Sequence, residues 1–453
     1  MKVVVIDDDP TGSQTVHSCL LLLRWDVEAL CRGLRHGSPL LFVLADTRSL
    51  TPDAAAQRNR EIVTNLEKAL AQEGFDRSEI QLVSRGDSTL RGHGVLEPAV
   101  LESCFGPFAA TLHVPAFLEG GRTTVNGVHL LHGEPVHTTP FAKDRLFGFS
   151  TSDLSHWLEQ KSAGAICATD VVKVSLEDLD QASTGGMPHL IQRLAALQGN
   201  VAVVVDAEHQ SQLSALAAAV QALKGERRFL FRSAASVVKA LADPGPQPLD
   251  SDGLARLRRR GPNGEELPGL VMVGSHVPLA DQQLIRLLAD SSCIGLELPV
   301  RRIARVLEGG TPDLLLLDLE REWCEQLQAL LQSGRTPVLF TSRGEIRLAS
   351  ASAGRLLSQT ISRLMGRLAN AVAPGLGHLI SKGGITTQTF LADGLGLEAV
   401  ELKGQLMPGL SLVRPSEGVA QELPILTFPG NVRIGKSCAT PHEGRTSDSP
   451  GIN

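Results

Sequence analysis

Acidic, hydroxyl and guanidinium side chains follow three successive apolar runs near the N-terminus. "KVVVID" leads into three consecutive aspartates at residues 7–9, "PLLFVLAD" leads into Thr47 and Arg48, and "EIQLVS" leads into "RGDSTLRG" at residues 85–92. In parallel β-sheets, ligands bind beyond the carboxyl ends of the strands, so these are the positions where chemistry is expected. The combination of residue types indicates a site for an anionic, hydroxyl-bearing ligand.

The adjacent aspartates at residues 7–9 are costly at a buried strand end unless they are solvated, paired or used. In one interpretation they bind the hydroxyls of a polyol, deprotonate one of them, or hold Mg²⁺ through water. In the other, one aspartate is a helix N-cap and its neighbours lie in a solvated turn, which holds for a single Asp roughly half the time. The polar ends of the two other strands favour the first interpretation.

Arg48 and Arg91 are the natural partners of an anionic substrate, because a guanidinium binds a carboxylate or phosphate through two parallel hydrogen bonds. They could instead form ion pairs with Asp8, Asp9 or Asp87 for structural reasons. The two interpretations are compatible, since such ion pairs would preorganise an anion site. Asp87 also adds a carboxylate, and the two residues after it add hydroxyl groups, to the same edge.

In the C-terminal half, two further strand ends carry glycine-containing turns. Ser275 follows "GLVMVG", and "SKGGITT" at residues 381–387 follows "HLI" and precedes a helix-like segment. Backbone N–H groups of such a turn at a helix N-terminus form an anion site, although paired glycines could equally form an ordinary tight turn. No GxGxxG fingerprint lies in a first βαβ unit, so a phosphate site built from several loops is favoured over a dinucleotide fold.

Residues 430–437, "GNVRIGKS", match the letters of a P-loop. A P-loop requires a helix to begin at its Lys-Ser pair, so that the helix N-terminus faces the phosphates. Pro441 and Gly444 prevent a sustained helix at that point. We therefore interpret this match as coincidental.

The apolar runs are rich in Val, Leu and Ile without clean alternation, which is typical of strands buried on both faces of a parallel sheet. Helix-like segments separate them; one of these, at residues 51–74, begins with Thr51-Pro52 and ends at Gly74. The sequence therefore predicts the α/β class, with two α/β domains that contain mainly parallel sheets.

A stretch rich in Pro, Gly and charge interrupts this pattern at residues 242–269. A chain of 453 residues also exceeds what one hydrophobic core usually supports. We predict an N-terminal domain at residues 1–245, a linker at 246–267, a C-terminal domain at 268–436 and a poorly ordered tail at 437–453.

The bulk composition excludes several classes of function. The net charge of -6 argues against a general nucleic-acid surface. Seven scattered cysteines without a CxxC pair indicate reduced thiols, and neither a signal peptide nor a membrane-spanning apolar run is found. We expect a cytoplasmic protein with neither nucleic-acid nor membrane partners.

Hydrolase and zinc-enzyme functions are disfavoured, because GxSxG and HExxH motifs are absent. His129, His132 and His137 lie close together in the sequence, but without a matching carboxylate they form a weak metal signal. We expect structural or solvated histidines there and predict no metal-ligating residues.

The motifs, taken in order, resemble those of the four-carbon acid sugar kinases. "DDDPTG", "ADTRS" and "RGDSTLRGH" are similar to the family's N-terminal motifs, and "VNGVHLLHGEPVHTTPFAKD" is similar to its middle segment. "VVVDAE", "VGSH", "SKGGITT" and "LKGQLMPG" are similar to its later landmarks. The resemblance is collinear over nearly the whole chain, and "DSTLRG" is its specific element.

The resemblance implies a sugar-acid-binding N-terminal domain, an ATP-binding C-terminal domain and an active-site cleft between them. It implies ATP-dependent phosphorylation, with Mg²⁺, of a hydroxyl on a small four-carbon sugar acid such as threonate or erythronate. Asp8 or Asp9 would act catalytically on that hydroxyl. The substrate contacts implied by position are Asp8 or Asp9, Arg48, Arg85, Gly86, Asp87 and Ser88, to which the guanidinium argument adds Arg91. The nucleotide contacts implied by position are Ser275, Ser381, Lys382, Gly383, Gly384 and Gly430.

The sequence departs from the family pattern near the expected nucleotide site. Ile385 stands where an acidic residue is common, and "FPGNVRIGKS" replaces a Lys-Ser-Gly-rich closing motif. These differences leave open a noncatalytic sugar-acid-binding or regulatory protein that has lost phosphoryl transfer. A dinucleotide-dependent oxidoreductase is disfavoured by the missing glycine fingerprint. The sequence leaves the particular acid and the oligomeric state open, a homodimer included.

Overall fold

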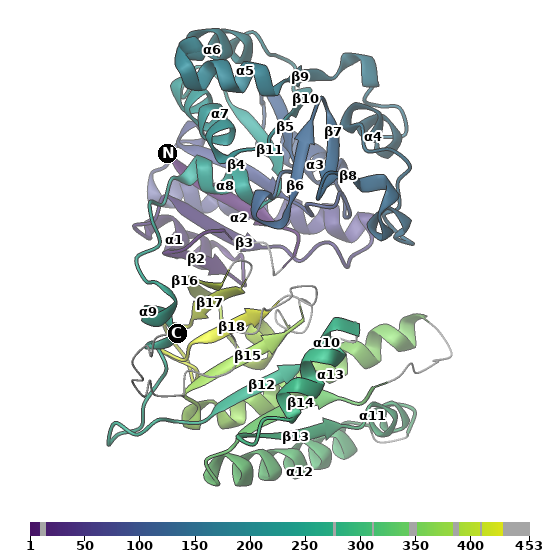
Figure 1. The fold of residues 1–453 in the computed structure, drawn as a ribbon, viewed down its shortest axis with the longest axis vertical. Coiled ribbons are helices and arrows are strands. Elements are labelled where there is room, and N and C mark those ends of the chain that lie inside the picture. Colours follow the sequence, from purple (N-terminus) through teal and green to yellow (C-terminus); the bar gives the residue numbers. More distant parts are fainter. Residues whose placement is uncertain are drawn as a thin grey trace, which may run out of the picture.

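A fifteen-stranded, mainly parallel sheet runs through the molecule, and helices cover its faces (Figure 1). The computed structural model describes residues 1–9, 15–274, 278–309, 312–343, 351–383, 389–407 and 410–428. A separate sheet of three short strands lies beside the N-terminal half. This architecture confirms the predicted α/β class.

The N-terminal half alternates strands and helices along the chain. Its strands are β1 (Lys2–Asp7), β2 (Cys19–Leu22), β3 (Leu40–Leu44), β4 (Ile80–Arg85), β5 (Ala110–Val114), β6 (Arg122–Val125), β7 (Val128–Leu131), β8 (Glu134–Pro135), β9 (Val172–Val174), β10 (Val201–Val205) and β11 (Phe229–Ser233). Its helices are α1 (Val27–Arg35), α2 (Pro52–Glu73), α3 (Leu96–Phe105), α4 (Leu154–Lys161), α5 (Leu176–Gln181), α6 (Met187–Ala195), α7 (Gln210–Ala222) and α8 (Ala235–Ala242).

The C-terminal half continues the same alternation. Its strands are β12 (Gly269–Val273), β13 (Cys293–Leu298), β14 (Thr336–Thr341), β15 (His378–Lys382), β16 (Ala399–Met407), β17 (Leu410–Arg414) and β18 (Ile425–Phe428). Its helices are α9 (Ser251–Ala255), α10 (Pro278–Leu288), α11 (Val300–Leu307), α12 (Pro312–Gln332) and α13 (Ala351–Val372).

Strands of the N-terminal half pair in parallel in the order β2-β3-β1-β4-β11-β5-β10-β9. Along β1, Val3 and Val5 pack into one hydrophobic core, whereas Val4 and Ile6 pack into another. Each face of the strand therefore meets apolar side chains. This explains why the strand sequences read as unbroken apolar runs.

Helix α2 forms where the sequence predicts it. The Thr51 hydroxyl accepts a hydrogen bond from the backbone N–H of Ala54, and Pro52 occupies the first helical position. Gly74 ends the helix in the left-handed conformation with φ of 73°, which costs glycine little. The helix packs beside α1 and α3 and holds the sheet edge that carries Arg48 in place.

The strands of the two halves form one continuous sheet, whereas the sequence predicted sheets within two domains and no pairing between them. Strands β13-β14-β12-β15-β18 are parallel, β17 pairs antiparallel with β18, and β16 pairs antiparallel with β17. Strand β16 then pairs antiparallel with β2, from Leu22 opposite Ala399 to Cys19 opposite Leu402. The pairing satisfies the backbone groups at the edge of β2, which would otherwise be an open sheet edge.

The predicted linker is structured at its beginning. The Gln247 side chain accepts a hydrogen bond from the Gln405 backbone N–H (2.7 Å) and donates one to the Gln405 carbonyl (3.2 Å). Helix α9 follows, and the Ser251 hydroxyl donates to the Leu406 carbonyl (2.8 Å). The connection is thus fastened to β16, the strand that joins the two halves. Across the ranges described above, no helix is both long and apolar enough to span a membrane.

Candidate active site

The carboxyl ends of β1, β3 and β4 bring the three polar N-terminal motifs together. Parallel register places Asp7 of β1 between Leu44 of β3 and Arg85 of β4. Beyond the strand ends, the Asp8 N–H donates to the Arg85 carbonyl (3.2 Å), and the Arg48 N–H donates to the Asp8 carbonyl (3.2 Å). The backbone therefore fixes the three loops relative to one another before any side chain contributes.

Arg48 is held between two of the aspartates. Its Nη2 donates to Asp8 Oδ1 (2.7 Å), its Nε donates to Asp8 Oδ2 (3.4 Å), and its Nη1 donates to Asp9 Oδ2 (2.8 Å). Of the five N–H groups of a guanidinium, these bonds use three, and the described residues take up no others. The ion pairs of the second interpretation are therefore present, whereas binding of an anion by Arg48 stays a prediction.

The two aspartates differ in accessibility. The Asp8 side chain is 1% exposed and both of its oxygens face Arg48, whereas the Asp9 side chain is 20% exposed. Arg85 lies against the buried side of the same cluster, with Nη1 3.5 Å from Asp7 Oδ1 and 3.9 Å from Asp8 Oδ1. Arg85 thus places a positive charge beside these aspartates within the fold, and its contact with a ligand stays a prediction.

The segment after β4 carries the second arginine. Arg91 Nε donates to Asp87 Oδ2 (2.7 Å), and its guanidinium lies 4.9 Å from the centre of the Phe141 ring. Burial alone would raise the pKa of Asp87, but Arg48 and Arg91, with a hydrogen bond from Thr89, hold it well below its usual range. Asp87 is therefore a carboxylate that ties the two candidate anion-binding arginines to one network.

Ser88 is positioned by a buried histidine. His129 Nε2 lies 2.8 Å from the Ser88 carbonyl, and its Nδ1 lies 3.0 Å from Thr124 Oγ1. Burial lowers the pKa of His129 to about 4, so the ring is neutral and structural, as expected. Within the described part of the chain, no group of three His, Cys, Asp or Glu side chains could hold a metal ion.

Two glycines permit the close packing of this site. A Cβ atom on Gly92, whose φ is 93°, would lie 2.8 Å from Asp8 Oδ2. A Cβ atom on Gly86 would lie 2.3 Å from Nη2 of Arg232. The predicted contact residue Gly86 is thus placed against a buried arginine of the protein itself.

Arg232 and Glu97 are residues of the site that the motifs did not reveal. Arg232 extends from the end of β11, and its Nη1 donates to Glu97 Oε2 (2.6 Å) and to Ser84 Oγ (2.8 Å). Its Nη2 lies 4.0 Å from Asp8 Oδ2, and the Thr47 hydroxyl donates to Glu97. Arg232 could have been found from the sequence, because it directly follows the apolar run "FLF". Glu97 lies inside a helix, where no sequence pattern marks it as part of a site.

Asp46 also lies at this edge, in an unusual backbone conformation. Its φ of 47° belongs to the left-handed region, which is uncommon for residues other than glycine. Burial, followed by the nearby charge of Asp9, raises the pKa of Asp46 to about 7. The carboxylates of this edge therefore experience strongly different environments.

Asp7 makes the stability of the protein depend on pH in a defined direction. It is 1% exposed, and burial raises its pKa to about 7 from an ordinary value of 3.8. Between these values the folded state keeps a proton that the unfolded state has lost. The free energy of unfolding therefore falls as pH rises through this window, by up to about 1.4 kcal/mol per pH unit from this group.

The variant Asp7→Asn should lack the pH-dependent contribution of this carboxyl group to the free energy of unfolding. Urea unfolding at pH 5 and pH 7 should show that the wild type loses stability relative to Asp7→Asn as the pH rises. An identical difference at the two pH values would show that Asp7 is charged in the folded protein throughout the window.

The predicted nucleotide residues that the structure describes lie at a second strand edge. Register aligns Val273 of β12, Lys382 of β15 and Phe428 of β18, and the Gly383 N–H donates to the Phe428 carbonyl (2.9 Å). Ser381 is fully buried, and Gly383 has φ of 123°, which other residues rarely adopt. Ser275, Gly384 and Gly430 lie outside the described residues.

Lys382 lies across the ring of Phe428. Its Nζ is 4.0 Å from the ring centre, and the residue is 5% exposed. Burial lowers the pKa of Lys382 to about 8. A cation at the carboxyl edge of a parallel sheet, next to a glycine turn, fits a phosphate group.

Two family models match this chain. A sugar-binding N-terminal domain matches residues 3–241, and a nucleotide-binding C-terminal domain matches residues 270–433. A D-threonate kinase from Cupriavidus necator is 28% identical over 381 residues, which cover 81% of this chain and 78% of that protein. A D-erythronate kinase from Heliobacterium modesticaldum is 24% identical over 454 residues, which cover 97% of this chain and 96% of that protein.

Solved structures share the fold. A Salmonella typhimurium LT2 protein, provisionally described as a tRNA synthase, superposes with a TM-score of 0.65 at 17% identity and covers 95% of this chain and 96% of its own. A Haemophilus influenzae protein of the DUF1537 family gives a TM-score of 0.62 at 16% identity, with 94% and 96% covered. Because these identities are low, the two structures establish the fold alone.

The fold and the matched domains define a two-domain protein whose halves match the sugar-binding and the nucleotide-binding domain models. The chain belongs to the four-carbon acid sugar kinase family, and its named relatives are sugar-acid kinases.

Proposed function

We propose that the protein transfers the terminal phosphoryl group of ATP to a hydroxyl of a four-carbon sugar acid such as threonate or erythronate. The observation that carries the proposal is Arg48, oriented by Asp8 and Asp9, with two N–H groups that donate to none of the described residues. The names of the relatives support a four-carbon acid as the acceptor.

Arg48 and Arg91 would hold the carboxylate of the acid. Arg91 uses its Nε on Asp87 and Thr89, and within the described residues its two terminal nitrogens donate to no other group. The negative charge of Asp87 interacts with both arginines. An anion placed between them would therefore meet a preorganised pair of guanidiniums, which lowers the entropic cost of binding.

Asp9 is the better placed of the two proposed catalytic aspartates. Its side chain is 20% exposed, whereas that of Asp8 is 1% exposed and offers both oxygens to Arg48. Asp9 can therefore orient the reacting hydroxyl and accept its proton, while Asp8 fixes Arg48. This division of roles is part of the proposal.

Lys382 and the backbone around Gly383 would hold the nucleotide phosphates. When bound, ATP supplies the phosphoryl group, and Mg²⁺ supplies positive charge that offsets the charge on the transferred group. Mg²⁺ commonly relies on phosphate oxygens and water with few protein carboxylates. The absence of a ready-made metal cluster from the described residues is compatible with an ion that arrives on the nucleotide.

The twist of the sheet supports a shared cleft for the two edges. If the sheet were flat, the pairing of its strands would make β15 antiparallel to β1. The order from one to the other is β15-β18-β17-β16-β2-β3-β1, so six steps between neighbouring strands separate them. At about 20–25° of twist per step, the two directions rotate by about 120–150°. The carboxyl edges of the halves would therefore turn toward the same side, as phosphoryl transfer between two bound ligands requires.

A cytoplasmic location is part of the proposal. Six cysteines within the described residues are free thiols, and two of them, Cys19 and Cys31, are buried. Disulfides are rare in the reducing cytoplasm, so free thiols favour that compartment.

A coupled assay of ADP release against three- to six-carbon sugar acids tests the proposed reaction. We expect the highest kcat/KM for a four-carbon acid, and ADP release that depends on both acid and Mg²⁺. Binding of the acid without ADP release would favour the alternative, a noncatalytic sugar-acid-binding protein.

Lys382→Met should weaken binding of ATP-Mg²⁺ by about 10- to 100-fold, because a charge-assisted hydrogen bond is lost. Affinity for the wild type should also fall as pH rises past about 8, where Lys382 loses its proton. Calorimetry with a nonhydrolysable ATP analogue measures both effects.

Lys403→Met is the matched control, because Lys403 pairs with Glu401 on β16 (2.5 Å) and plays no part in the proposed site. Equal affinities of Lys382→Met and the wild type for the analogue would remove Lys382 from the nucleotide site.

A further inference from the structure

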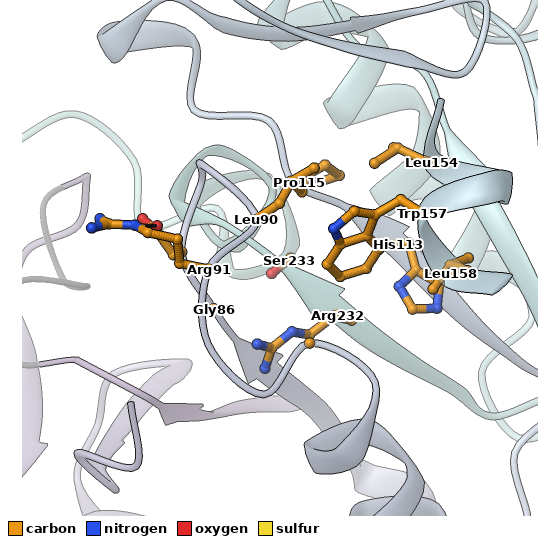
Figure 2. Close-up of a pocket in the computed structure, with 12 residues that line it drawn as sticks. Gly86, Leu90, Arg91, His113, Pro115, Leu154, Trp157, Leu158, Arg232 and Ser233 are labelled. Carbon is orange, nitrogen blue, oxygen red and sulfur yellow. Dashed lines mark hydrogen bonds and ion pairs between the residues drawn. The ribbon is translucent and has the colours of Figure 1, made fainter. Parts of the chain in front are cut away.

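A small cavity lies beside the candidate sugar-acid site, at the carboxyl ends of β4, β11 and β5 (Figure 2). Its volume is about 30 Å³. The loop after β4 forms one wall with Leu90, and helix α4 forms the opposite wall with Trp157. A space of this size is larger than the roughly 10–15 Å³ that one water needs, so it can admit a hydroxyl group.

Two residues that line this cavity carry hydrogen-bonding groups without a partner among the described residues. They are Nε1 of Trp157 and Oγ of Ser233, and the two residues are 4% and 3% exposed. Figure 2 shows the indole nitrogen and the Ser233 hydroxyl on the side of the cavity that faces Leu90. Buried polar groups are almost always hydrogen-bonded, because an unmade bond costs their full desolvation. The cavity is therefore built for an oxygen that accepts hydrogen bonds.

The charges around the cavity are already paired. Arg91 is bound to Asp87 (2.7 Å), and Arg232 is bound to Glu97 (2.6 Å). His113 lines the cavity, and burial followed by the nearby Arg232 lowers its pKa to about 3, so the ring is neutral. A neutral hydroxyl fits the surroundings of Arg232 and His113 better than an anion does, and the carboxylate of the acid would lie on the side of Arg91.

The wall toward Trp157 is rigid. A Cβ atom on Gly94 would lie 2.4 Å from the indole ring, so the backbone packs directly on it. Leu90 adopts a left-handed conformation with φ of 66°, and its side chain lines the cavity. Close packing limits the movement of the indole, as discrimination between hydroxyl configurations requires.

The cavity borders the candidate sugar-acid site. Asp87 and Arg91 line it and also belong to the network that includes Arg48. Strand β4 lies between β1, which carries the aspartates, and β11, which carries Ser233. An acid bound by Arg48 and Arg91 would therefore lie next to the opening of the cavity.

We propose that the cavity receives one non-reacting hydroxyl of the sugar acid, so that Trp157 and Ser233 determine which epimer binds. This inference rests on the proposed function. In this proposal the hydroxyl of one configuration would reach the two groups, and that of its epimer would point away. Threonate and erythronate differ in this way, at a single carbon.

Calorimetry with threonate and erythronate, without nucleotide, tests the inference. The wild type should prefer one epimer by at least about tenfold, equivalent to one good hydrogen bond. Ser233→Ala and Trp157→Phe remove the two donors and keep most of the packing. Each should bring the ratio of the two dissociation constants to within about threefold.

Ser155→Ala is the matched control. Ser155 lies on the same helix as Trp157, is 2% exposed and has an unpartnered hydroxyl among the described residues, but it does not line the cavity. This variant should keep the wild-type ratio.

The outcomes separate the inference from the proposed function. If the wild type binds neither acid, the proposed function fails and the inference fails with it. If the wild type binds both equally, or if Ser233→Ala and Trp157→Phe keep its preference, the cavity holds an ordered water only and the inference is overturned. Acid-dependent ADP release by the wild type would leave the proposed function standing in those cases.

Discussion

Replacing Asp9 with asparagine should lower kcat by about two to four orders of magnitude, because the reacting hydroxyl then lacks its proton acceptor. Affinity for the sugar acid should change little, since Arg48 keeps its bonds to Asp8 and remains oriented. Steady-state kinetics of ADP release give kcat, and calorimetry of acid binding gives the dissociation constant.

Asp8→Asn separates the two aspartates. Asp8 accepts two hydrogen bonds from Arg48, and it also faces Arg85 at 3.9 Å and Arg232 at 4.0 Å. Its replacement removes a negative charge that these three guanidiniums share. The acid should therefore bind more weakly and also react more slowly.

If Asp9→Asn kept the wild-type kcat, a different group would have to accept the proton.

Arg232→Met should destabilise the protein by about 3–5 kcal/mol, because it leaves Glu97 as an unpaired buried carboxylate. Glu97 and Arg232 are 3% and 8% exposed, and their atoms meet at 2.6 Å. The loss of stability caused by Arg232→Met should become smaller as the pH is lowered toward 5. Without Arg232 the buried carboxylate of Glu97 takes up a proton more readily than it does in the wild type. Urea unfolding at two pH values measures both effects.

Two controls distinguish a buried ion pair from a general loss of packing. The double variant Arg232→Met with Glu97→Met should recover most of the stability, since no uncompensated charge remains. Arg193→Met removes a more exposed pair with Asp178 and should cost only about 0–1 kcal/mol. A double variant as unstable as Arg232→Met would show that the charge of Glu97 does not cause the loss.

The sequence allowed the α/β class and the polar strand ends to be predicted, because these depend on local patterns. Apolar runs without alternation indicate strands covered on both faces, and β1 is such a strand. The residues directly after those runs lie at one edge by the geometry of parallel pairing. Arg48, Asp8 and Asp9 could therefore be placed together before the structure was known.

The buried support of the site could not be predicted in this way. Glu97 and Arg232 are 135 residues apart, and their contact depends on how α3 packs on the sheet. The cavity at Trp157 likewise requires α4 to lie over the end of β11. The joining of the sheets through β2 and β16 depends on register between distant strands, which composition does not encode.

Phosphorus NMR of the protein with ATP, Mg²⁺ and threonate or erythronate tests the central proposal most directly. We predict that a phosphomonoester resonance of the sugar acid grows as the terminal phosphate of ATP disappears, and that Asp9→Asn slows this growth by at least about a hundredfold. Release of inorganic phosphate alone, or no loss of ATP with any four-carbon acid, would contradict the proposed phosphoryl transfer.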